Sequence, residues 1–504
     1  MQDFLIIGGQ EPMETRLNDN SNVFQGIPPY FTPYGRDFIK ISGRAYSFPA
    51  YAVPVLAACL KKRRISVSCI NDFYQNDEES IARKVRNTKR AVGISTTFLT
   101  KESSITKIID FVKKTNPHVK VILGGAGIIN FPGVRKHADI NVFYEGEETI
   151  QELTYVFEKR RNIEDVKGIS YFKRGREIVN KRRDCIGDLG KIPIPAWNAV
   201  SDKPAEERYL PLESSRGCVG NCSFCLETKY WPGIRFYPVD RVVREIKAGI
   251  KKYGTRFYYF QDSNISNSRN YLKRLCDAIL ESNLCIKWSC ESRVDGLDRA
   301  LVDKMYRAGC RGITFGMESA DRRVLQNMNK AMSEDKPGLF SSTVRHMRKR
   351  NMLANINIIV GFPGEDKKSI KNTVDFLLEA KPFTYSMAKF FLEKGTDIWK
   401  NRKKFNLSGS MYDWRHNTMC SGELDAIVRE IFLRVSAKQE IYHWTSAAVD
   451  LVRALSKGKT FGNFIKYLKS INQICVEDLT KTHESYSSRY NDSFRYVTRY
   501  IQRT

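Results

Sequence analysis

The sequence predicts an α/β protein in which a doubly wound parallel sheet is followed by a partial barrel of parallel strands and then by a mainly helical region. Two observations carry this prediction. Short apolar runs alternate with amphipathic runs through two long stretches of the chain, which is the pattern of repeated strand and helix units. From Gly395 onward this alternation stops, and helical periodicity takes its place.

The first stretch of alternation predicts a sheet with helices on both faces. Its strand candidates are the apolar runs DFLIIG, ISVSCI, AVGIST, VKVILGG and ADINVFY. Amphipathic runs that separate them predict helices: AYAVPVLAACLKKR, ESIARKVRN, SSITKIIDFVKK and EETIQELTYVFEKR. The run GISYFKRGREIVNKR predicts a hairpin about a Gly-containing turn, and PIPAWN after it predicts a linker.

The second stretch begins at Tyr209 and predicts six strand and helix units. The strand candidates are YLPLESS, RFYYFQD, IKWSCE, GITFGM, NINIIVG and YSMAKFF. Because a closed barrel of this kind has eight units, six units predict a partial barrel. Ligands of parallel sheets bind beyond the carboxyl ends of the strands, so we expect the functional site there.

These patterns divide the chain into four parts. We expect a doubly wound domain at 1–160, a hairpin and linker at 161–205, the partial barrel at 206–394 and the mainly helical region at 395–504.

The sequence also predicts a cytoplasmic protein. The apolar opening MQDFLIIGG lacks a basic leader and is followed by polar residues, unlike a signal peptide. No apolar run approaches the roughly 20 residues of a membrane helix. Twelve cysteines without a disulfide-like grid fit a reducing compartment.

The charge of the chain suits an anionic partner without identifying one. Lys and Arg number 83 against 56 Asp and Glu, which gives a net charge of +27. Nucleic acid, a phosphorylated metabolite or an acidic peptide would match this surplus. The basic runs KKRR, KRR and RHMRKR fall at predicted element ends, where solvated basic faces are ordinary. No RNA-binding module is recognisable, so RNA binding or RNA modification ranks lowest among the functional alternatives.

Three cysteines within eleven residues form the strongest motif of the chain. The run RGCVGNCSFCL places Cys218, Cys222 and Cys225 after the first barrel strand. A structural zinc site needs a fourth ligand, and none lies close in the sequence. Three thiolates on a four-iron cluster leave one iron open to bind a ligand. Gly217 and Gly220 allow the tight wrapping that a cluster loop requires, which favours the cluster over zinc or chance proximity.

The cysteine loop resembles the CxxxCxxC loop of radical S-adenosylmethionine (SAM) enzymes, with an aromatic residue before the last cysteine. GITFGMESA and NINIIVGFPGE resemble the motifs of their fourth and fifth barrel strands. A doubly wound domain ahead of the barrel is the arrangement of the cobalamin-binding subclass. The segment GTDIWKNRKKFNLSGSMYDWRHNTM, together with NMNK upstream, is similar to the subgroup around the phosphinothricin P-methyltransferase.

This resemblance implies a Rossmann-like, flavodoxin-like cobalamin-binding domain and a partial (β/α)6 radical SAM barrel. It implies three cofactors, namely a 4Fe-4S cluster, SAM and cobalamin, and a reducing partner such as flavodoxin or ferredoxin. The implied reaction removes a hydrogen atom from the substrate with a deoxyadenosyl radical. Methyl then passes from methylcobalamin to an unactivated carbon, or a phosphinate phosphorus, of a biosynthetic intermediate or peptide. A radical SAM cyclase or rearrangement enzyme of the same architecture is the main alternative.

One departure concerns cobalt. The DxHxxG motif, with which some cobalamin proteins supply a histidine to the metal, is absent from the chain. If cobalamin binds, we expect no protein imidazole on its cobalt.

The resemblance makes the three cysteines the cluster ligands, with SAM on the open iron. The candidate SAM-binding residues are Phe224, Gln261, Asp262, Ser263, Arg293 and Glu318. The structural alternatives are a loop anchor for Phe224, a rim salt bridge for Glu318 and a mutual ion pair for Asp262 and Arg293. No catalytic residue is assigned.

Small or polar residues at three strand ends of the first domain are the cobalamin candidates. They are Ser95, Thr96, Thr97, Gly124, Gly125, Ala126, Glu145, Gly146 and Glu147. Ordinary turn chemistry of such a sheet also explains the glycines. His416 in WRHNTM is a candidate substrate contact, although a lone histidine more often has a structural role.

Overall fold

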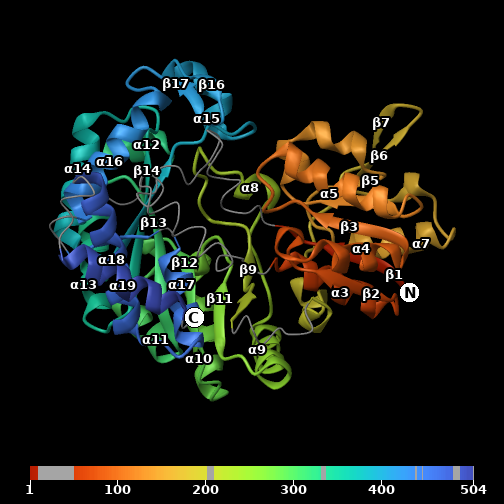
Figure 1. The fold of residues 1–504 in the computed structure, drawn as a ribbon, viewed down its shortest axis with the longest axis horizontal. Coiled ribbons are helices and arrows are strands. Elements are labelled where there is room, and N and C mark those ends of the chain that lie inside the picture. Colours follow the sequence, from red (N-terminus) through yellow and green to blue (C-terminus); the bar gives the residue numbers. More distant parts are fainter. Residues whose placement is uncertain are drawn as a thin grey trace. The chain divides into compact units, whose positions relative to one another are not determined.

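The computed structural model describes residues 1–9, 50–200, 209–330, 336–436, 440–444, 446–480 and 488–502. These residues form two compact units. The first contains the described residues up to 200 together with 235–241, and the second contains 209–234 and the described residues from 242 onward. Each unit is built on one seven-stranded sheet (Figure 1).

The sheet of the first unit has the order β2-β1-β3-β4-β5-β6-β7. Its first five strands are parallel, in the 2-1-3-4-5 order of flavodoxin-like sheets, and all five are runs that the sequence predicted as strands. The predicted hairpin is confirmed as β6 and β7, which extend the sheet antiparallel to β5. The strands are β1 (Gln2–Ile7), β2 (Val67–Ile70), β3 (Thr88–Ser95), β4 (Lys120–Gly124), β5 (Ile140–Val142), β6 (Ile169–Lys173) and β7 (Arg176–Val179). The helices are α3 (Ala52–Lys62), α4 (Glu78–Arg86), α5 (Glu102–Thr115), α6 (Gly127–Asn130) and α7 (Glu147–Phe157).

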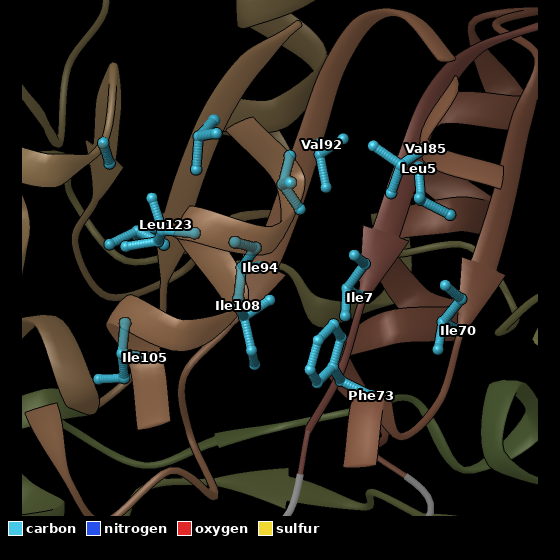
Figure 2. Packing of buried hydrophobic residues seen from close by; sticks show 14 of the residues in the cluster. Leu5, Ile7, Ile70, Phe73, Val85, Val92, Ile94, Ile105, Ile108 and Leu123 are labelled. Carbon is cyan, nitrogen blue, oxygen red and sulfur yellow. The ribbon is translucent and has the colours of Figure 1, made fainter. Parts of the chain in front are cut away.

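Apolar side chains of this sheet and its helices form the core of the first unit (Figure 2). Leu5 and Ile7 are two residues apart on β1 and therefore point to the same face. Ile105 and Ile108 are three apart on α5 and lie on one side of that helix. The two periodicities that predicted the elements thus also decide which side chains meet.

The sheet of the second unit has the order β18-β15-β14-β13-β12-β11-β8, and every pairing in it is parallel. Six of its strands are those that the sequence predicted. The seventh, β18, contains two residues, too few to show a periodicity in the sequence. The strands are β8 (Leu210–Leu212), β11 (Phe257–Phe260), β12 (Lys287–Ser292), β13 (Cys310–Glu318), β14 (Leu353–Val360), β15 (Thr384–Lys389) and β18 (Tyr442–His443).

Helices alternate with these strands and then dominate the C-terminal part. The first group is α9 (Val239–Tyr253), α10 (Arg269–Glu281), α11 (Arg299–Arg307), α12 (Arg322–Asn327), α13 (Lys336–Arg348) and α14 (Lys367–Ala380). The second group is α15 (Asp397–Lys400), α16 (Leu424–Ser436), α17 (Ala447–Ser456), α18 (Phe461–Thr480) and α19 (Ser488–Gln502), with a small hairpin of β16 (Ser408–Ser410) and β17 (Asp413–Arg415). Within the described parts of the chain, no helix has the length and apolar character needed to cross a bilayer.

The two faces of the second sheet are covered differently. Phe315 of β13 packs edge-on against Phe340 of α13, and we call this the outer face. Gly312 and Thr314 alternate with Phe315 and so belong to the opposite, inner face. A Cβ at Gly312 would lie 3.2 Å from Ala448 of α17, and α17 packs on β11 through β14. Helix α17 therefore lies on the inner face, near the amino end of β13.

Candidate functional site

The three cysteines lie in the loop between β9 (Ser215–Arg216) and α8 (Glu227–Tyr230). Gly220 sits between two of the sulfurs: a Cβ built there would be 3.5 Å from Cys218 Sγ and 3.6 Å from Cys222 Sγ. Gly217 has a φ of 88°, and a Cβ there would lie 2.1 Å from the carbonyl oxygen of Gly233. Only glycine fits at 217, so the loop depends on Gly217, whereas a Cβ at Gly220 would meet the two sulfurs at ordinary contact distances.

The sulfurs of this loop suit an iron–sulfur cluster. The Gly220 N–H donates to Cys218 Sγ at 3.3 Å, and the Glu227 N–H donates to Cys225 Sγ at 3.4 Å. Burial raises the pKa of Cys218, and it raises that of Cys225 to about 11, so thiolates here need a strong positive partner.

The number of thiolates also bears on the kind of metal site. A structural zinc ion takes four ligands, whereas a four-iron cluster takes one thiolate per iron and can leave one iron open, which suits the three cysteines of this loop.

The NMNK segment at 327–330 is hydrogen-bonded to the cysteine loop. The N–H of Ser223 donates to the carbonyl of Met328 at 2.8 Å, and its hydroxyl donates to the carbonyl of Asn327 at 2.9 Å. Asn329 Nδ2 donates to the carbonyl of Asn221 at 2.7 Å. The sequence identified this segment by likeness alone, because contacts between residues about a hundred positions apart leave no local pattern.

Glu318 closes β13 in an unusual backbone conformation. Its φ of 69° is left-handed, which costs a residue other than glycine about 1–2 kcal/mol. Its Oε1 lies 2.8 Å from Lys330 Nζ, and a Cβ at Gly316 would collide with both groups. Strained backbone of this kind gathers at functional sites. The rim salt bridge is therefore present, and contact of Glu318 with SAM stays a prediction.

Asp262 and Arg293 have other partners than each other. The buried carboxylate of Asp262 accepts hydrogen bonds from the N–H and hydroxyl of Ser214, at 3.0 and 2.7 Å, and from the hydroxyl of Ser215, at 2.6 Å. Burial raises the pKa of Asp262 to about 6. Arg293 pairs with Asp295 at 3.0 Å. The mutual ion pair that was the structural alternative is thus wrong. Asp262 instead joins the end of β11 to Ser214 and Ser215, and its contact with SAM stays a prediction.

Arg293 nevertheless reaches the cysteine loop. Its Nη1 lies 3.2 Å from the position of a Cβ at Gly220, between the sulfurs of Cys218 and Cys222. It is therefore the SAM candidate that the geometry supports best.

The other three SAM candidates are held in different ways. Phe224 packs edge-on against Phe362 at 6.0 Å, in keeping with the loop-anchor alternative. The backbone of Gln261 donates to the carbonyl of Leu212. The exposed Ser263 hydroxyl bonds to the carboxylate of Glu227, whose pKa is raised by burial.

His416 occupies a buried position. Its Nε2 lies 3.1 Å from the carbonyl oxygen of Gly361, and its Nδ1 accepts from the N–H of Thr418 at 3.3 Å. The ring stacks on Trp414 at 5.0 Å, and burial lowers the pKa of His416. Because both ring nitrogens have protein partners, this geometry favours the structural alternative over the substrate contact that we expected.

The cobalamin candidates lie at one edge of the first sheet, where the carboxyl ends of β3, β4 and β5 point the same way. The N–H and hydroxyl of Thr96 donate to the carbonyl of Gly124, at 2.7 and 2.9 Å. Gly125 has a φ of 105°, and a Cβ there would lie 2.6 Å from Thr97 Oγ1. Ser95 pairs with Gly124, and Ala126 precedes α6. The glycines at this edge have no side chain that would keep a ligand away from the backbone.

The third strand end differs from the other two. Gly146 begins α7 and Glu147 is buried in its first turn. The buried Glu145 carboxylate accepts from Arg235 Nη1 at 2.8 and 3.0 Å and from the N–H of Ile186 at 2.6 Å. Glu145 therefore ties distant parts of its own unit together, which corrects our expectation that its carboxylate is available to cobalamin.

The described histidines of this unit do not belong to the carboxyl edge. His118 precedes β4 and His137 precedes β5, so both lie at the amino ends of strands. The expectation that cobalt carries no protein imidazole stays a prediction.

One carboxylate on the inner face of the second sheet was missed. Glu291 of β12 accepts a hydrogen bond from the Tyr259 hydroxyl of β11 at 3.1 Å. Its signal in the sequence was alternation with the buried residues Trp288 and Cys290, which a short strand shows only weakly.

Comparisons with known proteins agree with this geometry. The B12 binding domain family matches residues 42–154, and the radical SAM superfamily matches residues 212–377. An uncharacterized methyltransferase of Pyrococcus horikoshii is 28% identical over 65% of this chain and 72% of its own length. An anaerobic magnesium-protoporphyrin IX monomethyl ester cyclase of Rubrivivax gelatinosus is 24% identical over 67% of this chain and 63% of its own length. A cytidylyl-2-hydroxyethylphosphonate methyltransferase of Streptomyces wedmorensis is 24% identical over 60% of this chain and 63% of its own length.

Two solved structures share the fold. The radical SAM methyltransferase TsrM of Kitasatospora setae has a TM-score of 0.63 at 16% identity and covers 79% of this chain and 75% of its own. The cobalamin-dependent radical SAM enzyme OxsB has a TM-score of 0.60 at 14% identity and covers 100% of this chain and 71% of its own. With a B12 binding domain matched in the first unit and a radical SAM domain matched in the second, the chain is a cobalamin-dependent radical SAM enzyme, a class whose cofactors are a 4Fe-4S cluster, SAM and cobalamin.

Proposed function

We propose that the protein is a methyltransferase that acts on an unactivated carbon, or a phosphinate phosphorus, of a biosynthetic intermediate or peptide. The observation that carries the proposal is the three-cysteine loop at the barrel strand ends. It is combined with a carboxyl edge that contains glycines in the sheet of the cobalamin-binding unit. Two of the relatives described above are named methyltransferases, which supports this class of reaction. When bound, the cluster and SAM supply a radical, and cobalamin carries the methyl group.

The residues of this chain have positioning roles in the proposal. Cys218, Cys222 and Cys225 hold the cluster, and the N–H groups of the loop orient two of their sulfurs. Arg293 and Glu318 are the groups that we assign to SAM, through its carboxylate and a ribose hydroxyl. Charged hydrogen bonds of this kind fix a ligand more strongly than neutral ones. A flavodoxin or ferredoxin would supply the electrons.

A test of methyl transfer does not need the acceptor. The reconstituted protein is reduced and given SAM with a deuterated methyl group, and the cobalamin extracted from it is weighed by mass spectrometry. We expect the deuterated methyl on cobalamin, with one S-adenosylhomocysteine formed for each methyl group moved. An unlabelled cobalamin, with S-adenosylhomocysteine at background, would remove methyl transfer as the leading function.

Cyclisation is the second candidate, and a specific observation favours it. Relatives named anaerobic magnesium-protoporphyrin IX monomethyl ester cyclase cover about two thirds of this chain at 24–25% identity. A cyclase would form 5′-deoxyadenosine with its substrate but leave no methyl mass on the product. The deuterium experiment therefore separates the two candidates.

A further inference from the structure

A basic segment, residues 393–404, follows β15 and lies against the cysteine loop. It contains five Lys or Arg residues against two acids, Glu393 and Asp397. The N–H of Ile398 in α15 donates to the carbonyl of Ser223 at 2.8 Å. Ser223 lies between two of the three cysteines, so the basic segment is one hydrogen bond away from the loop that we assign to the cluster.

Most of the positive charge of the basic segment has no partner. Asp397 already pairs with Lys229 of α8 at 3.1 Å and with Lys400 at 3.8 Å. Among the described residues, no carboxylate forms an ion pair with the four other cations, which are Lys394, Arg402, Lys403 and Lys404. The three lysines of this group are exposed, and the arginine is half-buried. These charges therefore remain available to a partner that supplies carboxylates.

An aromatic ring lies among these cations. Trp399 is half-buried, and its ring centre lies 4.7 Å from Cζ of Arg402 and 5.9 Å from Nζ of Lys394. Tryptophan and arginine are enriched in protein interfaces. Basic residues are ordinary at the C-terminal end of a helix, but Lys394 precedes α15, so this effect does not explain it. Because the four cations extend over eleven residues, they suit the surface of an acidic protein better than one small anion.

We propose that the basic segment is the docking surface for an acidic electron-transfer protein of the flavodoxin kind. Electron transfer weakens steeply with distance, so a donor protein must bind close to the cluster, and the basic segment begins beside the cysteine loop. One electron leaves the reduced flavin and enters the cluster, so the flavin is oxidised and the cluster is reduced by one electron. Electron-transfer complexes bury little surface and depend on complementary charge for fast association. The inference rests on the proposed function only in that radical formation begins with this reduction.

Charge reversal tests this surface without turnover. The reconstituted holoprotein is mixed anaerobically with fully reduced flavodoxin, and the bleaching of the cluster absorbance is followed by stopped flow. Lys403→Glu/Lys404→Glu should lower the second-order rate constant about tenfold at low salt, because charges at the edge of an interface act mainly on the association rate. The matched control Lys251→Glu/Lys252→Glu changes the net charge equally at an exposed pair of lysines near the end of α9. Because α9 leads into the amino end of β11, away from the cysteine loop, this control should keep the wild-type rate.

Dithionite separates loss of docking from damage to the cluster, because this small reductant needs no docking surface. It should reduce the wild type and both double variants at nearly the same rate. With flavodoxin, the difference between the variants should disappear at about 1 M salt, where the screening length is about 3 Å. Equal rates of the two double variants with flavodoxin at low salt would overturn the proposal and leave the basic segment as an ordinary solvated face. An equally large loss of rate with dithionite, or a wild type that dithionite reduces and flavodoxin does not, would also overturn it. None of these results depends on whether methyl is transferred.

Discussion

Lys330 Nζ lies 2.8 Å from Oε1 of Glu318, at the strand end where Glu318 holds a left-handed backbone conformation. Lys330 is also the last residue of the NMNK segment, which is hydrogen-bonded to the cysteine loop through Asn327 and Asn329. The pair therefore connects the cysteine loop to the end of β13. A substitution in one of these two segments should alter the stability of the other.

Lys330→Met should destabilise the protein. Both side chains of the pair are largely buried, and removing one partner of a buried ion pair costs about 3–5 kcal/mol. We expect a lower thermal unfolding midpoint and faster release of iron to a chelator. Lys371→Met is the control, because its pair with Asp375 is exposed on α14, where solvent screening leaves an ion pair little effect on stability. Equally small effects of the two substitutions would show that the Lys330 and Glu318 pair contributes no more to stability than an exposed pair does.

Asn329→Gly should loosen the cysteine loop without straining the backbone. Asn329 has a φ of 50°, which glycine adopts freely, so this change removes only the hydrogen bond to Asn221. A net loss of about 1 kcal/mol corresponds to roughly fivefold faster release of iron. Asn329→Ala adds backbone strain and should be worse than Asn329→Gly. An unchanged rate of iron release in both variants would show that the hydrogen bond from Asn329 does not stabilise the cysteine loop.

Replacing Cys218, Cys222 and Cys225 together with alanine should abolish the brown chromophore and all cleavage of SAM. The expectation follows from the need for one thiolate per ligated iron. Iron and sulfide analysis after anaerobic reconstitution measures it, with Cys285→Ala as a control at an exposed cysteine. About four irons per chain retained in the triple variant would refute the ligand assignment.

Glu365 should make stability fall as pH rises. Burial raises its pKa from 4.5 to about 8, so the folded protein holds this proton more tightly than the unfolded chain does. The stabilising contribution is complete below about pH 4.5 and disappears as the pH rises through about 8. Between about pH 6 and pH 8 the loss amounts to about 2 kcal/mol, because the slope of 1.36 kcal/mol per unit falls to half as the pH reaches the folded pKa.

Glu365→Gln should remove this dependence, because the amide resembles the protonated acid and can accept the hydrogen bond from the Gly361 N–H. Thermal midpoints of wild type and variant measured across this pH range give the comparison. Glu379→Gln, an exposed position on α14, should follow the wild type. Parallel pH profiles for wild type and Glu365→Gln would contradict the assignment.

Cobalamin in this protein should show no protein imidazole on its cobalt. The chain lacks DxHxxG, and the described histidines of the first unit lie at the amino ends of strands. Electron paramagnetic resonance of the Co(II) form, with and without ¹⁵N-histidine labelling, is the measurement. A nitrogen splitting that changes with the label would identify a histidine ligand and refute this expectation.

Sequence patterns alone predicted the hairpin of β6 and β7, the cysteine loop, and the parallel strands of both units except β18. These features are local: period-2 alternation, helical periodicity and ligand spacing all arise within a few residues. Contacts between residues far apart in the chain could be identified only from the three-dimensional structure. They include the Glu145 and Arg235 pair and the Glu318 and Lys330 pair. Each joins residues far apart in the chain, and which of them meet depends on strand order and register, which no local pattern encodes.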